Sequence, residues 1–287
     1  MSRLPRALGV NTWVWTSPLD DASLERLAHH VAKMGFDVIE LPLENAGDWD
    51  AARAADVLAE VGLTAVVVGA MGPGRSLLDG AGDVEATLDY LRTCVATAAR
   101  LGAHTVAGPF YAPTGLTWRM SAEERAAAGR QLRARLGRLA EDAAERSVAI
   151  GVEPLNRYET SVMNTVEQGL ELLAGALGPA LGLALDTYHL GIEEKRPVDA
   201  IRLADGAVVH VQVCGSDRGA VGDDHTPWPE VLDALDDIGY AGPLVLESFT
   251  GENATIAVAA SIWRPLAASQ DELALRSLAH LRALNGE

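Results

Sequence analysis

The chain has 287 residues, of which 48% are hydrophobic, and a formal net charge of −17 at pH 7. That length is enough for one large α/β domain or two small ones, with ample material for a core. The acidic balance argues against nucleic acid or an anionic membrane surface as a partner, because both attract basic patches.

Other totals narrow the class further. The first six residues lack the apolar segment of a signal peptide, and no window reaches membrane-spanning length without charges or helix breakers. The two cysteines, Cys94 and Cys214, form neither a disulfide framework nor a CxxC site. We therefore expect a soluble cytoplasmic protein. Only Lys33 and Lys195 are lysines, and neither lies on an expected strand, which argues against a Schiff-base aldolase.

Short apolar runs, many rich in β-branched residues, recur along the chain and predict strands, each followed by a helical pattern. The expected strands cover residues 8–15, 37–43, 64–70, 104–111, 148–152, 181–186, 207–213 and 244–249. The expected helices cover 24–34, 49–61, 84–101, 121–146, 166–177, 198–203 and 228–238, with two more near the C-terminus. An acidic loop is expected after residue 186. Ser121 followed by Glu124 is a capping-box pattern that predicts a helix start.

Eight strands alternating with helices predict a (β/α)₈ TIM barrel. The structural alternative is a doubly wound sheet, which usually has a glycine-rich phosphate loop after its first strand. The sequence at that place is TWVWTSP, residues 12–18, so the barrel is favoured. No linker or composition shift marks a second domain. We expect one domain over residues 1–287, with extra C-terminal helices.

Three expected strands end in a carboxylate. Glu153 follows the fifth strand, Asp186 ends the sixth, and Glu247 lies at the end of the eighth. In a barrel of this kind, function gathers at the C-terminal ends of the strands. A single buried acid is often merely hydrogen-bonded or paired. Three of them in one dry pocket would repel one another unless a divalent cation is bound.

The seventh expected strand adds a polar face. His210, Gln212 and Cys214 alternate with valines, and the period of two places the polar trio on one side. Neighbouring strands lie about 4.8 Å apart, so four adjacent strand ends can converge on one ion. We expect His210 to lie beside the site rather than to bind the ion. Cys214 is expected to be packing rather than a nucleophile, because no activating base can be assigned to it.

Several blocks resemble the ketose 3-epimerases, the D-tagatose/D-allulose 3-epimerase group of the xylose-isomerase-like TIM barrels. The blocks are EPLNRYET at 153–160, LDTYH at 185–189, SDRG at 216–219 and ESF at 247–249. Residues 9–16 and IWR at 262–264 also fit, so the similarity runs nearly end to end. The first two blocks are the specific part, because the barrel pattern alone would not choose among relatives.

The resemblance implies that Glu153, Asp186 and Glu247 are metal ligands. It also implies that Glu153 and Glu247 are the catalytic acid–base residues on opposite faces of the substrate's C3. The positions it implies for binding the sugar's O1 to O3 end are Glu159, His189 and Arg218. The implied reaction is metal-dependent epimerisation of a free ketose at C3. A metal would acidify C3–H and stabilise a cis-enediolate, while the two carboxylates remove and return the proton.

The sequence departs from the family pattern at the fourth ligand. The family's usual histidine on the seventh strand is replaced by Gln212, whose side-chain oxygen can also bind a metal. Hydroxypyruvate isomerases of this superfamily are similar in using a glutamine there. An all-oxygen set of ligands favours Mn²⁺ or Mg²⁺ over Zn²⁺. We expect Mn²⁺, with Mg²⁺ or Co²⁺ as alternatives. Gly215 also stands where members of the family commonly have a glutamate. The identity of the sugar therefore stays open.

Further candidates for substrate binding lie at strand ends and in one loop. Four aromatic residues end the first and fourth expected strands and either stack on the sugar or belong to the core: Trp13, Trp15, Phe110 and Tyr111. Of these, Trp15 and Tyr111 are predicted to bind the sugar. His225 lies in the loop GDDH, residues 222–225, and is either a substrate contact or a solvated residue. The role of Arg157, and with it a phosphorylated substrate, stays open.

Alternative functions share the barrel. A hydroxypyruvate-type aldose–ketose isomerase or a keto-sugar lyase or dehydratase would use the same enediolate. A DNA-repair endonuclease would need a histidine-rich multi-zinc cluster and a basic face, and the sequence of this acidic chain shows neither. A non-catalytic sugar-binding protein is suggested only by the missing histidine. The expected partner is a small-molecule sugar, with no nucleic acid or membrane, and we expect a homodimer or homotetramer.

Overall fold

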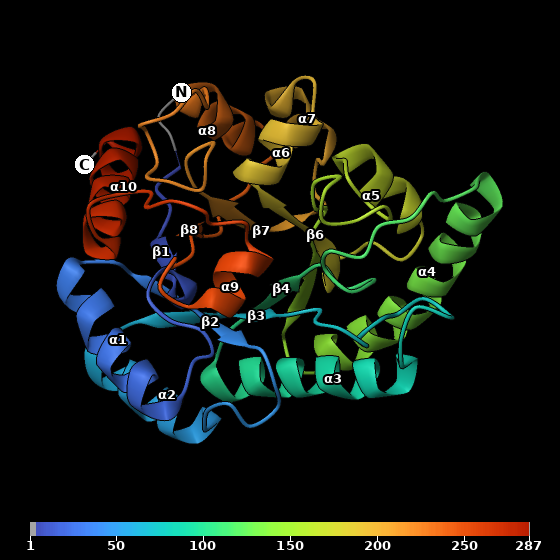
Figure 1. The fold of residues 1–287 in the computed structure, drawn as a ribbon, viewed down its shortest axis with the longest axis horizontal. Coiled ribbons are helices and arrows are strands. Elements are labelled where there is room, and N and C mark those ends of the chain that lie inside the picture. Colours follow the sequence, from blue (N-terminus) through green and yellow to red (C-terminus); the bar gives the residue numbers. More distant parts are fainter. Residues whose placement is uncertain (1–3, 287) are drawn as a thin grey trace.

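The computed structural model describes residues 4–286, so the predicted domain limits at 1 and 287 lie outside the described residues. Eight parallel strands close into a barrel in chain order, β1 to β8 (Figure 1). The strands are β1 Leu8–Asn11, β2 Val38–Leu43, β3 Thr64–Gly69, β4 Thr105–Gly108, β5 Ala149–Val152, β6 Leu181–Asp186, β7 Val208–Val213 and β8 Leu244–Leu246. The predicted single-domain (β/α)₈ TIM barrel is confirmed.

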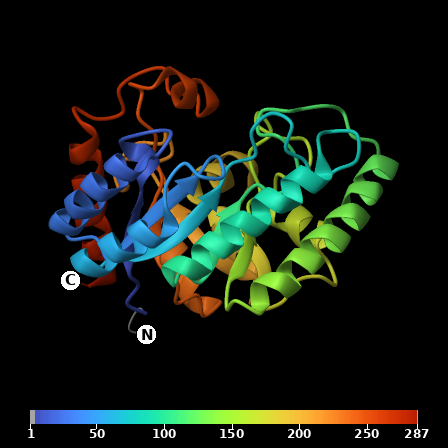
Figure 2. The ribbon, with the colours of Figure 1, turned by 90° about the horizontal axis from the view of Figure 1, so that it is seen from below.

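Helices surround the barrel. They are α1 Asp21–Met34, α2 Ala51–Val61, α3 Val84–Leu101, α4 Ala122–Ala144, α5 Val166–Leu172, α6 Thr187–Glu193, α7 Pro197–Leu203, α8 Trp228–Asp237, α9 Ala254–Ala259 and α10 Gln270–Asn285, with a 3₁₀ helix η1 at Thr12–Val14. Figure 2 shows the ring of helices from the side, with the segment that carries α9 arching over one end of the barrel. The two predicted C-terminal helices are therefore confirmed as α9 and α10.

Local sequence explains the ends of the helices. The predicted capping box is present at the start of α4, where Ser121 Oγ accepts from the main-chain N–H of Glu124 at 3.2 Å and a Glu124 oxygen accepts from that of Ser121 at 2.6 Å. At the start of α3, the Asp83 side chain accepts from the N–H of Ala86, and the helix ends at Gly102, whose φ of 68° suits glycine. Such caps satisfy main-chain groups that the helix itself leaves unpaired.

The strands are largely buried on both faces, as a barrel inside a ring of helices requires. All six residues of β2 and all six of β6 are buried. Gly182 lets β6 approach β7 closely, because a Cβ at this position would lie 2.3 Å from the carbonyl oxygen of Ala207. The pairing of β6 with β7 places Asp186 beside Gln212. The polar residues near the C-terminal ends of β6 and β7, which were predicted to converge, are thus neighbours.

The expected elements differ from the structure mainly at the rim that carries the polar residues. The first, fourth and eighth strands are shorter than expected. At their C-terminal ends the chain leaves the strand conformation, entering η1 after β1 and loops after β4 and β8. The expected acidic loop after residue 186 is in fact α6, whose first turn is capped by the Asp186 side chain accepting from the N–H of Tyr188 at 2.9 Å. Its weak helix formers gave no signal, since packing rather than propensity decides short helices.

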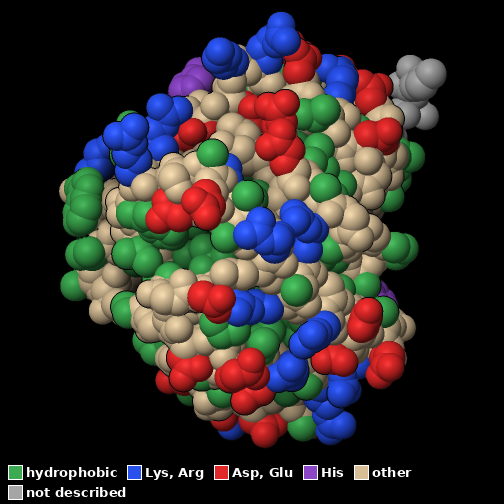
Figure 3. Space-filling view, turned by 90° about the vertical axis from the view of Figure 1, so that its right-hand side faces the viewer, with side chains coloured by type: hydrophobic (Ala, Val, Ile, Leu, Met, Phe, Trp, Pro, Cys, Tyr) green, Lys and Arg blue, Asp and Glu red, His purple; other side chains and the backbone are tan. Residues whose placement is uncertain are grey.

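The outer surface mixes charges. The face shown in Figure 3 has acidic and basic side chains interspersed with apolar ones. Within residues 4–286, no helix is long and apolar enough to cross a bilayer.

Candidate active site

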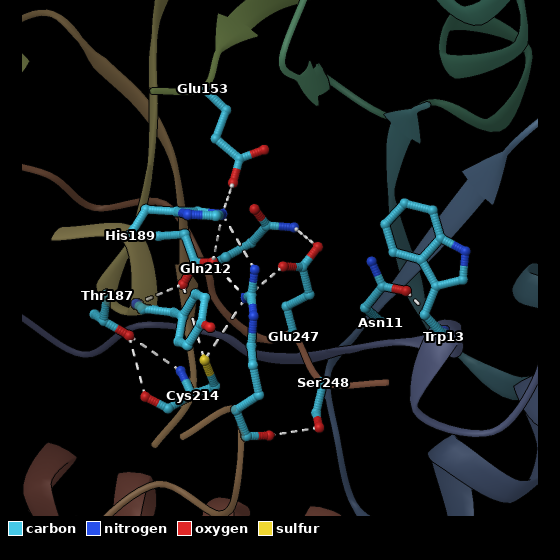
Figure 4. A network of polar contacts seen from close by, with 12 residues as sticks. Asn11, Trp13, Glu153, Thr187, His189, Gln212, Cys214, Glu247 and Ser248 are labelled. Carbon is cyan, nitrogen blue, oxygen red and sulfur yellow. Dashed lines mark hydrogen bonds and ion pairs between the residues drawn. The ribbon is translucent and has the colours of Figure 1, made fainter. Parts of the chain in front are cut away.

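Four polar side chains from successive strands meet at the carboxyl end of the barrel. Glu153 directly follows β5, Asp186 ends β6, Gln212 lies in β7, and Glu247 directly follows β8. All four residues are at least 94% buried, with exposures of 6%, 1%, 2% and 4%. Figure 4 shows the side chains of Glu153, Gln212 and Glu247 together, with Gln212 between the two carboxylates in this view. The structure therefore brings together the predicted ligand set.

The amide of Gln212 is held in one orientation. Its Nε2 donates to Oε1 of Glu247 at 2.8 Å and to Oε2 of Glu40 at 2.8 Å. Its Oε1 is buried and accepts no hydrogen bond within the described structure. A buried carbonyl oxygen without a partner is costly unless another group occupies it. This oxygen can therefore serve a metal, as can the carboxylates around it.

Arg218 enters the same pocket from the loop after β7. Its Nη1 lies 2.5 Å from Oδ2 of Asp186 and 2.8 Å from Oε2 of Glu247, and the guanidinium carbon lies 4.1 Å from the centre of the Tyr188 ring. The Arg218 backbone has φ 66°, which is unusual for a residue other than glycine. Ser248 Oγ stabilises this turn by donating to the Arg218 carbonyl at 2.6 Å.

The charges of the pocket are unbalanced. Burial raises the pKa of Glu153 well above its usual range, and the charges of Glu247 and Asp186 raise it further. Burial also raises the pKa of Glu247 to about 8 and raises that of Asp186, although Arg218 opposes both shifts. One buried guanidinium thus does not offset the carboxylates around it. A divalent cation would do so and would compete with protons for their oxygens.

His189, on α6, is a neutral donor. Burial, followed by the charge of Arg218, lowers its pKa well below its usual value. The main-chain N–H of Asn156 donates to its Nδ1 at 3.0 Å. A neutral imidazole that accepts at Nδ1 carries its proton on Nε2. That proton faces Oε1 of Glu153 and Oδ2 of Asp186, which lie 3.5 and 3.6 Å from Nε2.

This tautomer bears on metal binding. Ligand atoms of Glu153, Asp186 and His189 lie within 4.8 Å of one another, so this group could hold a metal. Metal binding at Nε2 would require the proton to move to Nδ1, which already faces a main-chain N–H. The oxygen of Gln212 has no such conflict. Among the described residues, the carboxylates with Gln212 therefore fit a hard divalent ion better than a set that includes His189.

The predicted sugar-binding residues adjoin this group. Nη2 of Arg218 lies 3.1 Å from Nε2 of His189, so the guanidinium and the imidazole are direct neighbours. Glu159 is partly buried, and the loss of solvation raises its pKa; one of its oxygens accepts from Nδ2 of Asn156 at 2.7 Å. The structure thus brings all three predicted positions, Glu159, His189 and Arg218, into one connected network.

Trp15 and Tyr111 have other surroundings than expected. The indole N–H of Trp15 donates to Asp271 of α10 at 2.7 Å, and its ring edge packs against His30 of α1. Tyr111 is 0% exposed and its hydroxyl donates to the carbonyl of Glu153 at 2.9 Å, so it holds the end of β5. Trp13, the other aromatic candidate at the end of the first strand, lies beside the site (Figure 4), with its ring 5.5 Å from that of Phe249. The 3₁₀ turn at residues 12–14 gives the two tryptophans different surroundings, because it rotates successive side chains out of strand alternation.

His225 and Cys214 also have clear surroundings. His225 lies in a loop, and its Nδ1 contacts Ser216 Oγ at 3.0 Å. It lines a cavity of about 250 Å³ that includes Thr187 and Lys195. Cys214 points into the site, with Sγ 3.9 Å from Asp186, and burial raises the pKa of its thiol well above the usual value. This supports packing rather than nucleophilic attack, as expected for a thiol without an activating base.

The structure adds a buried acid that the sequence reasoning missed. Glu40, in β2, is 0% exposed and contacts His210 at 3.0 Å, Gln212 at 2.8 Å and Asn11 at 3.2 Å. Its signal was a lone acid in the apolar strand VIELPL. His210 faces into the barrel beside the site, as predicted.

Comparisons with known proteins identify the family. The family model described as "Xylose isomerase-like TIM barrel" matches residues 28–284. The chain belongs to the xylose isomerase-like TIM barrel family. Within this family it is 32% identical over 282 residues to the L-ribulose 3-epimerase of Mesorhizobium japonicum, covering 97% of this chain and 93% of that protein. It is also 32% identical over 279 residues to the ketose 3-epimerase of Arthrobacter globiformis, covering 96% and 95%.

Solved structures of the family agree. An L-ribulose 3-epimerase structure superimposes with a TM-score of 0.90 at 28% identity, covering 98% of this chain and 95% of that one. A D-allulose 3-epimerase from Methylomonas sp., in complex with D-allulose, gives 0.88 at 28% identity and covers 99% of both chains. The predicted resemblance and the predicted class, an enzyme of the isomerase type, are confirmed.

Proposed function

We propose that this chain epimerises a free ketose at C3 through a cis-enediolate, with Glu153 and Glu247 as the two acid–base groups. The observation that carries the proposal is the convergence of these carboxylates with Asp186 and the unpartnered Gln212 Oε1 in one buried pocket. The relatives named above as 3-epimerases, matched over nearly the whole chain, support the reaction type and a free ketose as substrate.

The proposed metal is Mn²⁺, with Mg²⁺ or Co²⁺ as alternatives, held by Glu153, Asp186, Gln212 and Glu247. When bound, it would acidify C3–H and stabilise the enediolate oxygens. The residues fit it because the set consists of oxygen donors, one of them unpartnered, in a pocket with surplus negative charge. The alternative ligand His189 is disfavoured by its tautomer.

The chain's own groups supply the proton transfers. One carboxylate removes the C3 proton and the other delivers a proton to the opposite face of the planar intermediate. Nε2–H of His189 and the guanidinium of Arg218 are proposed to donate to oxygens at the O1 to O3 end, and Glu159 to accept from a hydroxyl.

The decisive test is epimerisation in D₂O, followed by NMR of the product. Solvent deuterium should appear at C3 of the inverted sugar. Glu153→Gln and Glu247→Gln should each lose complete inversion. Each is expected to retain exchange only of the epimer whose hydrogen faces the remaining carboxylate. Inverted product without deuterium would contradict proton transfer by two solvent-exchanging carboxylates.

A second experiment tests the metal. Asp186→Ala should lose both Mn²⁺ binding and turnover, measured by calorimetric titration and a ketose assay. Full activity after exhaustive chelation would contradict metal dependence.

Product analysis separates C3 inversion from the aldose–ketose isomerase and lyase alternatives, which yield an aldose or an eliminated product. A cytoplasmic location and a homodimer or homotetramer remain predictions, the latter checked by light scattering.

A further inference from the structure

The amide of Gln212 uses both of its hydrogens on carboxylates. Nε2 lies 2.8 Å from Oε1 of Glu247 on one side and 2.8 Å from Oε2 of Glu40 on the other. A primary amide has two N–H donors, so this pair of bonds exhausts the nitrogen. The oxygen must then point the other way, and it is the buried atom without a partner.

Glu40 is itself held on both oxygens. Oε1 contacts Nε2 of His210 at 3.0 Å, and Oε2 accepts from Nδ2 of Asn11 at 3.2 Å. Asn11 is paired directly with Glu40 in the barrel, because β1 and β2 are neighbours with these residues in register. The carboxylate is 0% exposed, so it is shielded from bulk solvent. Glu40 therefore offers Gln212 a fixed acceptor.

From these contacts we propose that Glu40 is the positioning residue that turns Gln212 Oε1 toward the metal. The opposite amide orientation would place a carbonyl oxygen against two carboxylates, which is repulsive in a buried site. Glu247 alone does not fix the orientation, because as a ligand it shares its oxygens with the ion and with Arg218. Glu40 lies outside the proposed ligand set and stays available as an acceptor.

This inference rests on the proposed function, since it assumes a metal bound by Gln212. It explains how a glutamine can stand where histidine is usual. Histidine ligands are commonly oriented by an acceptor on the ring nitrogen that does not bind the ion, and loss of such a partner typically lowers metal affinity about 10-fold to 100-fold. Glu40 gives the amide the same support.

The test is a double-mutant cycle with Mn²⁺ as the probe. Mn²⁺ affinity is measured by electron paramagnetic resonance and calorimetry on the full chain in four forms: wild type, Glu40→Gln, Gln212→Leu and the double variant. Glu40→Gln keeps the shape but replaces one carboxylate oxygen by an N–H₂ donor and removes the negative charge, so it weakens the preference for one orientation of the Gln212 amide. We expect each single variant to bind Mn²⁺ about 10-fold more weakly. The double variant should be no weaker than the singles, because Glu40 acts only through Gln212.

A matched control is His210→Gln, which disturbs the same buried carboxylate yet leaves its bond to Gln212 in place. It should bind Mn²⁺ within about 3-fold of wild type. Urea unfolding of each metal-free variant checks the fold, and Glu40→Asp, with the carboxylate drawn back by one methylene, replaces Glu40→Gln if that variant does not fold. Glu40→Asp should then weaken Mn²⁺ binding as well.

The outcomes separate this inference from the proposed function. Wild-type protein that fails to bind Mn²⁺ would overturn the proposed metal centre and the inference with it. Wild-type binding that Glu40→Gln leaves unchanged would overturn the inference alone. So would a double variant about 100-fold weaker than wild type, because independent effects multiply.

Discussion

Nη1 of Arg218 lies 2.8 Å from Oε2 of Glu247, and both side chains are at most 6% exposed. Asp186 contacts the same nitrogen at 2.5 Å, so a single guanidinium serves two buried carboxylates. Burial by itself would lower the pKa of Arg218, but the two carboxylates outweigh burial and raise it well above its usual value. Arg218 is therefore positively charged at every pH considered in the predictions below.

The first prediction concerns this ion pair. Arg218→Leu should lower the free energy of unfolding of the metal-free protein by about 3–5 kcal/mol, because removing one partner leaves buried charge uncompensated. Urea unfolding at pH 7.5 measures it. The control is Arg157→Leu, since the Arg157 side chain is 60% exposed in its pair with Glu193. That pair should contribute little to stability, because solvent screens an exposed ion pair. Equal losses in the two variants would contradict the prediction.

The second prediction is a pH dependence. The pKa of Glu247 is raised from 4.5 to about 8, so the folded protein binds more protons than the unfolded chain between these values. The resulting stability is fully present below pH 4.5 and is lost as the pH rises through 8. Unfolding free energies of the metal-free protein should therefore fall from pH 5 to pH 8.5.

Two measurements isolate the cause of that fall. Glu247→Gln should make the stability less dependent on pH, since its amide does not titrate. Saturating Mn²⁺ should stabilise wild type more at pH 8 than at pH 5.5, because the ion displaces protons from its ligands. Metal-free protein that gains stability between pH 5 and pH 8 would contradict the prediction.

The third prediction concerns the glutamine. Gln212→His should keep the fold and still bind metal, but its preference should move toward Co²⁺ or Zn²⁺, which imidazole suits better. Titrating the metal-free protein with each ion gives the order of affinities. An order identical to that of wild type would place Gln212 outside the ligand set.

The fourth prediction concerns the barrel itself. Gly182→Ala should destabilise the protein by about 1–3 kcal/mol, because the added Cβ would lie 2.3 Å from the Ala207 carbonyl oxygen and force β6 from β7. Gly137→Ala is the matched control, since it lies within α4 and a Cβ there meets nothing within 4 Å. It should stabilise by up to about 1 kcal/mol through helix propensity. Thermal unfolding of both variants gives the comparison.

The sequence alone predicts the barrel and most of the candidate site, because both depend on local patterns. Strand periodicity placed Glu153, Asp186 and Glu247 at strand ends, and the period of two placed His210 and Gln212 on one face. The strand ends of a parallel barrel all open toward one rim, so convergence follows from topology alone.

Only the tertiary structure decided how these groups are held. Glu40 and Gln212 are 172 positions apart and meet only because the barrel closes. The tautomer of His189 depends on the main-chain N–H of Asn156, 33 positions away. The 3₁₀ turn η1, which the sequence did not predict, decides that Trp13 lies beside the site while Trp15 contacts α10. The direction of a hydrogen bond and the orientation of a side chain depend on atomic positions within a single residue. A hydrophobic pattern that repeats every two or more residues tells only on which face of an element a residue lies, so it does not predict them.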